Sequence, residues 1–125
     1  METRQPLVLV VEDYQDAREM YAAYLSFSGY RVAEATNGIE AIEKTVELMP
    51  DIILMDLALP RMDGWEATRR LKADAELSKI PVIVISARAM PADEERARSA
   101  GCDDFLTKPL DEAVLFQKLE RHLGG

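Results

Sequence analysis

Three short runs of apolar residues constrain the fold of this chain more than any other feature of its sequence. They cover residues 7–11, 52–55 and 82–85, and none of them contains a polar side chain. Strands without a polar position are typical of the interior of a parallel sheet, where helices cover both faces. The segments between these runs carry apolar residues at helical spacing. This alternation predicts an α/β fold.

Two weaker strands complete the predicted sheet. Residues 30–34 alternate in polarity, and Phe105 with Leu106 forms a short fifth strand, so we expect both at the edges of the sheet. With right-handed crossovers, this placement predicts a flavodoxin-like, doubly wound five-stranded parallel sheet in the order 2-1-3-4-5, with five helices.

The helical spacing also predicts which side of each helix is buried. Asp63 and Asp111 are the expected N-caps of the third and last helices. The expected inward-facing residues are Ala17, Met20, Tyr21, Tyr24 and Leu25 in the first helix, Ile39, Ile42, Val46 and Met49 in the second, Ala67 and Leu71 in the third, and Val114, Leu115 and Leu119 in the last.

Polar side chains follow the strands at the point where each one ends. Glu12 and Asp13 follow the first strand, Asp56 the third, Ser86 the fourth and Lys108 the fifth. Because the carboxyl ends of parallel strands meet at one edge of the sheet, and ligands bind there, we expect these five groups to share one crevice.

This set of groups indicates phosphoryl chemistry at a metal ion. Three neighbouring acids repel one another unless they share protons or hold a hard cation, and Mg²⁺ (or Mn²⁺) suits them, with Asp13 and Asp56 as direct ligands and Glu12 supporting through water. Lys108 and Ser86 would bind phosphoryl oxygens. Asp56 would then attack as a carboxylate nucleophile and form an aspartyl phosphate.

From about Leu7 to Leu123, the sequence resembles the receiver domain of two-component response regulators. The motifs that carry the resemblance are Glu12-Asp13, Asp56, Pro60, Met62-Asp63-Gly64, Ser86-Ala87, Ala100-Gly101, Phe105 and Lys108-Pro109. Three departures are mild: Glu12 replaces the commoner Asp, Ser86 the commoner Thr, and Phe105 a frequent Tyr.

The resemblance implies a role for each matching residue. Asp56 is the phosphoacceptor, the acidic pair binds the metal, and the backbone carbonyl of Ala58 completes the metal shell. Ser86 and Lys108 bind the phosphoryl group, and Ser86 with Phe105 forms the conformational switch. The resemblance also implies a cis peptide bond between Lys108 and Pro109.

The resemblance further implies partner proteins. A sensor histidine kinase or a histidine phosphotransfer protein would donate the phosphoryl group, and a downstream target protein would bind the switched face. We expect the donor to dock on an exposed stripe of the first helix, Tyr14, Arg18 and Ala22, next to Pro109. A monomer, or a weak phosphorylation-dependent dimer, is expected.

Composition excludes other classes of partner. The net charge of -8 argues against direct nucleic-acid binding, which needs clustered basic residues. No apolar run approaches the roughly 20 residues that span a membrane, and a signal peptide is lacking, so a cytoplasmic location is expected. We interpret residues 1–125 as a single receiver without an output domain, and a receiver excised from a larger regulator or hybrid kinase stays open.

One enzymatic alternative uses similar chemistry. A Mg²⁺-dependent phosphohydrolase of the haloacid-dehalogenase type also has an aspartate nucleophile after a strand, but it places a second Asp two residues on. Ala58 stands there and cannot act as a general acid. We therefore expect a phosphoacceptor that assists its own phosphorylation and dephosphorylation, not an enzyme.

Overall fold

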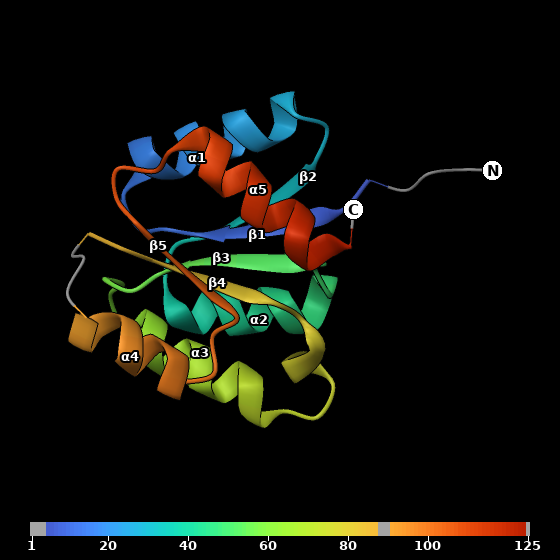
Figure 1. Cartoon of the computed structure of the whole chain (residues 1–125). Coiled ribbons are helices and arrows are strands. Elements are labelled where there is room, and N and C mark those ends of the chain that lie inside the picture. Colours follow the sequence, from blue (N-terminus) through green and yellow to red (C-terminus); the bar gives the residue numbers. More distant parts are fainter. Residues whose placement is uncertain (1–4, 88–90, 125) are drawn as a thin grey trace.

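The structure is a computed structural model that describes residues 5–87 and 91–124. Within these residues, five strands alternate with five α-helices (Figure 1). The elements are β1 (Leu7–Val11), α1 (Gln15–Phe27), β2 (Arg31–Ala35), α2 (Gly38–Leu48), β3 (Ile52–Asp56), α3 (Gly64–Ala73), the short 3-10 helix η1 (Leu77–Lys79), β4 (Val82–Ser86), α4 (Pro91–Ser99), β5 (Asp104–Thr107) and α5 (Glu112–Leu123).

The sheet is parallel and has the order β2-β1-β3-β4-β5, which confirms the predicted topology. The two weaker strands, β2 and β5, lie at its edges. From β1 the chain adds β2 on one side of the sheet and then crosses back to add β3, β4 and β5 on the other side, so the topological switch point lies between β1 and β3. A crevice for a ligand is expected at the carboxyl ends of these two strands.

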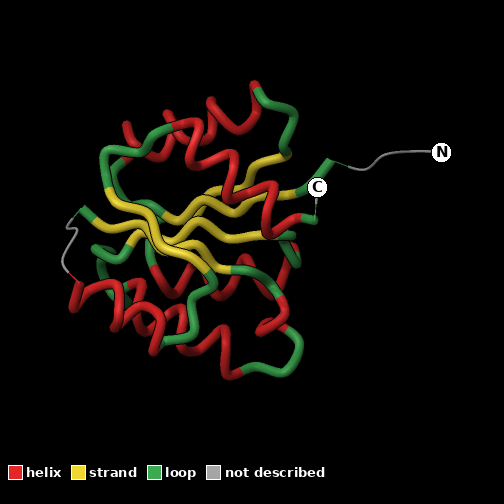
Figure 2. The backbone as a smooth tube through the Cα atoms, viewed as in Figure 1, coloured by secondary structure: helices red, strands yellow, loops and turns green. Residues whose placement is uncertain are grey.

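Helices cover both faces of the sheet in three layers (Figures 1 and 2). Helices α1 and α5 lie on one face, and α2, α3 and α4 lie on the other. Alternate residues of each central strand point to opposite faces. Val10 and Leu54 therefore pack with Tyr21 of α1 and Leu115 of α5, whereas Met55 joins the core on the other side.

Local capping defines where several helices begin. The side chain of Asn37 accepts a hydrogen bond from the Glu40 backbone N–H at 2.8 Å, and Asp63 accepts one from Glu66 at 3.0 Å. Asp111 caps α5 in the same way. Asp63 and Asp111 are the predicted caps, and each satisfies backbone donors that have no partner within the helix.

The predicted inward faces are right for α3 but partly wrong for three other helices. Met20, Val46 and Met49 are 44%, 60% and 47% exposed, and Val114 is 36% exposed. In α2, small residues face the core instead: Gly38, Ala41 and Thr45 are buried. A Cβ atom on Gly38 would lie 2.1 Å from the carbonyl oxygen of Met62, so the first turn of α2 approaches the loop before α3 too closely for a side chain at this position.

Among the residues that the structure describes, no helix is both long enough and apolar enough to cross a membrane.

Candidate functional site

The polar groups predicted at the strand ends lie along one edge of the sheet. Backbone hydrogen bonds continue the strand ladder into the loops that carry them: the Glu12 N–H donates to Ala35 O at 3.0 Å, and the Lys108 N–H donates to Ser86 O at 2.8 Å. Asp56 is the last residue of β3. The fold therefore fixes the backbone of each group before any ligand binds.

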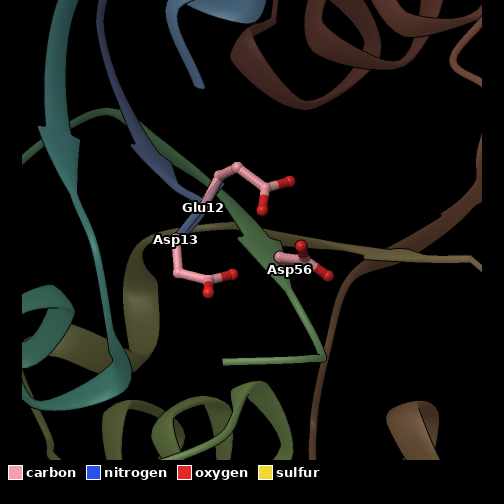
Figure 3. Close-up of side chains that lie close together, drawn as sticks. All are labelled: Glu12, Asp13 and Asp56. Carbon is pink, nitrogen blue, oxygen red and sulfur yellow. The ribbon is translucent and has the colours of Figure 1, made fainter. Parts of the chain in front are cut away.

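Three carboxylates meet at the carboxyl ends of β1 and β3 (Figure 3). Glu12, Asp13 and Asp56 can each offer one oxygen such that all three oxygens lie within 4.8 Å of one another. Glu12 and Asp56 are buried, at 2% and 4% exposure, whereas Asp13 is exposed. Buried like charges at this spacing are unfavourable unless a cation offsets them, so this donor set fits a hard divalent ion.

Lys108 supplies a cation from the protein itself. Its Nζ atom donates to Oε1 of Glu12 and to Oδ2 of Asp56, each at 3.0 Å. Burial alone would lower the pKa of Lys108, but the hydrogen bonds to Glu12 and Asp56 outweigh burial and raise it. The ammonium is therefore charged at neutral pH and positioned to contact an anion bound to Asp56.

Glu12 responds differently to the same surroundings. Burial raises the pKa of its carboxyl group, and so does the neighbouring Asp56. The hydrogen bonds from Lys108 and from the Tyr14 backbone N–H, which lies 3.1 Å from Oε2, oppose this rise without cancelling it. Glu12 therefore holds a proton more readily than an ordinary glutamate.

The loop after β3 is tightly folded around Asp56. The Ala58 backbone N–H donates to Oδ1 of Asp56 at 3.2 Å, which orients the carboxylate. A Cβ atom on Gly64 would lie 2.3 Å from the Asp56 carbonyl oxygen, so only glycine fits there. Asp56 thus has one oxygen at Ala58 and the other at Lys108.

A pocket of about 330 Å³ opens beside Asp56 and reaches Ser86. Trp65 and Asp93 also line it. Asp93 is not among the site residues expected from the sequence, where its only signal is its place in the first turn of the helix that starts at Pro91. The pocket is the space into which a group attached to Asp56 would extend.

Phe105 lies on the neighbouring strand, with its side chain on the same face as Ser86. Phe105 is the register partner of Val84, and Ser86 is the register partner of Thr107, so residues 84, 86 and 105 share one side of the sheet. Phe105 is half-buried and packs against the core on the side of α2, α3 and α4.

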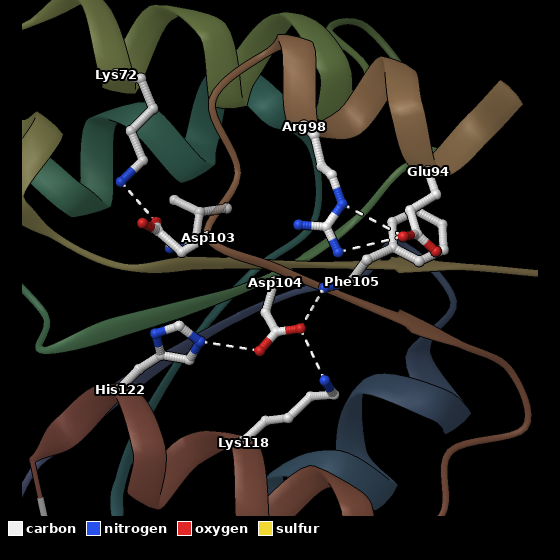
Figure 4. Close-up of polar contacts among 9 residues, drawn as sticks. Lys72, Glu94, Arg98, Asp103, Asp104, Phe105, Lys118 and His122 are labelled. Atoms are coloured by element: carbon white, nitrogen blue, oxygen red, sulfur yellow. Dashed lines mark hydrogen bonds and ion pairs between the residues drawn. The ribbon is translucent and has the colours of Figure 1, made fainter. Parts of the chain in front are cut away.

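Polar contacts at the start of β5 hold the strand that leads to Lys108 (Figure 4). Asp103 pairs with Lys72 of α3 at 2.7 Å. Asp104 forms an ion pair with Lys118 at 2.8 Å and a hydrogen bond with His122 at 2.9 Å, both on α5. Two consecutive acids therefore attach β5 to helices on opposite faces of the sheet.

The stripe predicted for partner docking is not uniformly exposed. Tyr14 is 63% exposed and Pro109 is exposed, but Ala22 is half-buried and the Arg18 side chain is only 14% exposed. Arg18 points inward because it pairs with Glu34 of β2 at 3.0 Å. The expectation that Arg18 belongs to an exposed stripe is therefore wrong.

The Lys108–Pro109 peptide bond is cis.

Comparisons with known proteins agree with this geometry. Residues 8–120 match the sequence profile of the response regulator receiver domain. The chain is 39% identical over 117 residues to the polar-differentiation response regulator DivK of Brucella anthropi, covering 94% of this chain and 95% of DivK.

Solved structures show the same similarity. The receiver domain of the sensor histidine kinase PA1611 from Pseudomonas aeruginosa, which has a magnesium ion coordinated in its active-site cleft, superposes with a TM-score of 0.90 at 35% identity, over 98% of this chain and all of that one. The chemotaxis protein CheY4 of Vibrio cholerae gives a TM-score of 0.90 at 27% identity, over 96% of this chain and all of that one.

Proposed function

This chain belongs to the response regulator receiver domain family of two-component phosphorelays, and we propose that Asp56 is its phosphoacceptor. Proteins of this family are phosphoacceptors and not enzymes in the usual sense, and membership implies a histidine kinase as the phosphoryl donor. The observation that carries the proposal is the position of Asp56. It is a buried carboxylate that contacts Lys108 and opens onto a pocket reaching Ser86.

The proposed reaction is a transfer from nitrogen to oxygen. An Asp56 carboxylate oxygen attacks the phosphorus of a phosphohistidine, and an O–P bond forms while the P–N bond breaks. The electron pair of the broken bond stays on the donor's imidazole, which leaves neutral when its other nitrogen is protonated. Lys108 and the Ser86 hydroxyl donate hydrogen bonds to phosphoryl oxygens.

We propose that Mg²⁺ (or Mn²⁺) is the ion that the carboxylates hold. Asp13, Asp56 and the backbone carbonyl of Ala58 would bind it, with Glu12 supporting through water. When bound, the ion would neutralise negative charge on the phosphoryl oxygens. The exposed Asp13 leaves this side of the cluster open to solvent, which suits an ion that keeps several of its waters.

The proposed output is a switch between two arrangements of β4 and β5. A phosphoryl oxygen draws the Ser86 hydroxyl toward Asp56, and Phe105 turns inward into the space that is vacated. Ser86 and Phe105 face the same side of the sheet, which supports this coupling. The surface formed by α4, β5 and α5 would then bind the downstream target.

We propose that the donor protein docks beside the crevice, on Tyr14, Ala22 and Pro109. Tyr14 offers a largely exposed aromatic ring one residue after Asp13, and Pro109 follows Lys108. The donor would be either a sensor histidine kinase or a histidine phosphotransfer protein. We expect the encounter to take place in the cytoplasm.

A phosphotransfer assay tests this proposal. Purified histidine kinases and phosphotransfer proteins, each carrying a radiolabelled phosphohistidine, are mixed with the chain in the presence of Mg²⁺. We expect a subset of the donors to label the chain. We expect no labelling when EDTA is added before the donor. Steady-state turnover of a phosphate monoester would instead indicate a phosphohydrolase.

A further inference from the structure

The Arg18 guanidinium group contacts backbone and side-chain oxygens of the protein itself. A residue that only docks a partner protein does not need such contacts. Its Nη1 atom donates to the backbone carbonyl oxygen of Glu12 at 3.0 Å and lies 3.5 Å from that of Asp13. Its Nε atom donates to Oε1 of Glu34 at 3.0 Å. The guanidinium group therefore lies between strand β2 and the loop that joins β1 to α1.

These contacts act on the backbone of the acidic pair. The two carbonyls belong to the residues whose carboxylates form two thirds of the acidic cluster, Glu12 and Asp13. Two successive peptide planes that are held in place fix the Cα–Cβ direction of the residue between them. Arg18 contacts the carbonyls of the two planes that flank Asp13, and the Glu12 N–H bond to Ala35 holds the plane that precedes Glu12. Arg18 thus constrains where the acidic side chains point, although it touches neither carboxylate.

Glu34 holds the guanidinium in place. Its carboxylate pairs with Nε of Arg18, and Lys44 donates a hydrogen bond to its backbone carbonyl. The Glu12 N–H also donates to Ala35 O at 3.0 Å, so the loop is attached to β2 through both its backbone and Arg18. A planar guanidinium can bridge two acceptors in different directions, which a lysine ammonium on a flexible stem does less well.

We propose that Arg18 is a positioning residue for the metal site. It holds the Glu12–Asp13 loop in the orientation in which both carboxylates face Asp56. The cluster is therefore already assembled when the ion arrives. This inference rests on the proposed function, because the ion is taken to be Mg²⁺.

If charge alone decided the outcome, removing Arg18 would have the opposite effect on the affinity for Mg²⁺. A guanidinium near a dication repels it, so deleting the positive charge would tighten Mg²⁺ binding if electrostatics decided the outcome. The Glu34 carboxylate, 3.0 Å from the guanidinium, already offsets part of that charge. Positioning should therefore dominate, and the sign of the change in affinity separates the two effects.

The test is a calorimetric titration of the apoprotein with MgCl₂ alone. Arg18→Met keeps the apolar stem and removes the guanidinium, and we expect a loss of about tenfold or more in Mg²⁺ affinity, the range seen when groups that orient metal ligands are removed. Arg18→Lys should fall between this variant and the wild type. The matched control is Arg31→Met, because Arg31 also donates to a backbone carbonyl, that of Gln5, at 2.9 Å. Its affinity should equal that of the wild type.

Amide hydrogen exchange gives a second reading. Exchange at Asp13 and Tyr14 should be faster in Arg18→Met than in the wild type without metal, while exchange in β3 stays unchanged.

Unchanged or tighter Mg²⁺ binding by folded Arg18→Met would overturn the inference. If Arg18→Met does not fold, an Arg18→Lys variant with the Mg²⁺ affinity of the wild type would overturn the inference. By contrast, a wild-type protein that binds no Mg²⁺, or an Asp13→Asn variant that binds it equally well, would count against the proposed function itself.

Discussion

The Nζ atom of Lys108 lies 3.0 Å from Oδ2 of Asp56, although 52 residues separate them in the sequence. The parallel topology brings them together, because β3 and β5 both end at the same edge of the sheet. With Glu12 at the same distance, the ammonium is placed between two buried carboxylates. It therefore offsets their repulsion in the resting protein and is available to a phosphoryl group afterwards.

Replacing Lys108 by Met should slow phosphorylation and leave metal binding intact. Loss of one positioned donor to a developing charge costs on the order of 10²-fold in rate. Mg²⁺ affinity should not fall, because the substitution removes a competing cation from the carboxylates. The measurements are the rate of label transfer at saturating Mg²⁺ and a calorimetric titration.

Lys118→Met is the matched control for this variant. Lys118 also pairs with a buried aspartate, Asp104, at 2.8 Å, but on the far side of the fold from the pocket. Its transfer rate should stay close to that of the wild type. Equal slowing in both variants would show that general destabilisation, and not the position of Lys108, limits transfer.

Asp104→Asn should destabilise the fold in a pH-dependent way. Burial alone would raise the pKa of Asp104, but the hydrogen bonds from Lys118, His122 and the Phe105 N–H lower it from 3.8 to about 2. Because the folded-state pKa is depressed, the contribution to stability is present above pH 3.8 and is lost as the pH falls toward 2. The shift corresponds to about 2 kcal/mol.

Denaturant unfolding of the wild type and of Asp104→Asn should therefore differ by about 2 kcal/mol at pH 7 and by progressively less below pH 3.8. The control is Glu120→Gln, at an exposed position of α5, the helix that carries Lys118 and His122. Its free energy of unfolding should change little at either pH. A difference that does not depend on pH would show that ionisation of Asp104 is not what stabilises this end of β5.

Ser86→Ala should separate phosphorylation from its structural consequence. The variant keeps Asp56 and Lys108, so it should still be labelled. Amide chemical shifts induced by phosphorylation in α4 and at Phe105 should shrink, because the hydroxyl that draws β4 toward the phosphoryl group is gone. A full set of induced shifts in this variant would mean that the switch runs through Lys108 or the loop after Asp56 instead.

Tyr14→Ala should change which donors label the protein without changing its affinity for Mg²⁺. The ring is largely exposed, and the contact from Tyr14 to Glu12 uses the backbone N–H, which the substitution keeps. The measurement is the relative transfer rate across a panel of donors, with Phe27→Ala as a control at an exposed aromatic residue at the far end of α1. An identical order of donor preference in both variants and the wild type would remove Tyr14 from the docking surface.

The strands and the site could be predicted because their signals are local. An unbroken apolar run between helical segments is typical of a strand inside a parallel sheet, and a polar residue that ends such a run is expected at the sheet edge. Asp56 followed directly from this, whereas Lys108 follows the weaker fifth strand and was placed at the same edge by the predicted topology. Their 3.0 Å contact did not follow, because it depends on the relative placement of two loops.

Helix faces were harder to predict because large apolar residues are not always the buried ones. Thr45 is buried while Val46 is 60% exposed, and the buried side of α2 also includes Gly38, where an added Cβ atom would lie 2.1 Å from the Met62 carbonyl oxygen. Arg18 shows the same limitation. Its spacing places it near Tyr14 on α1, but its guanidinium turns inward to acceptors on β2 and the acidic loop, which no helical period encodes.

The central claim is that the Asp56 carboxylate accepts the phosphoryl group, and one measurement tests it directly. After transfer from a phosphorylated donor in Mg²⁺, borohydride reduces an aspartyl phosphate to homoserine, and peptide mass spectrometry then locates the changed residue. We predict homoserine at position 56, and none anywhere in Asp56→Asn. Homoserine at another aspartate of the wild type, or undiminished labelling of Asp56→Asn, would contradict the assignment.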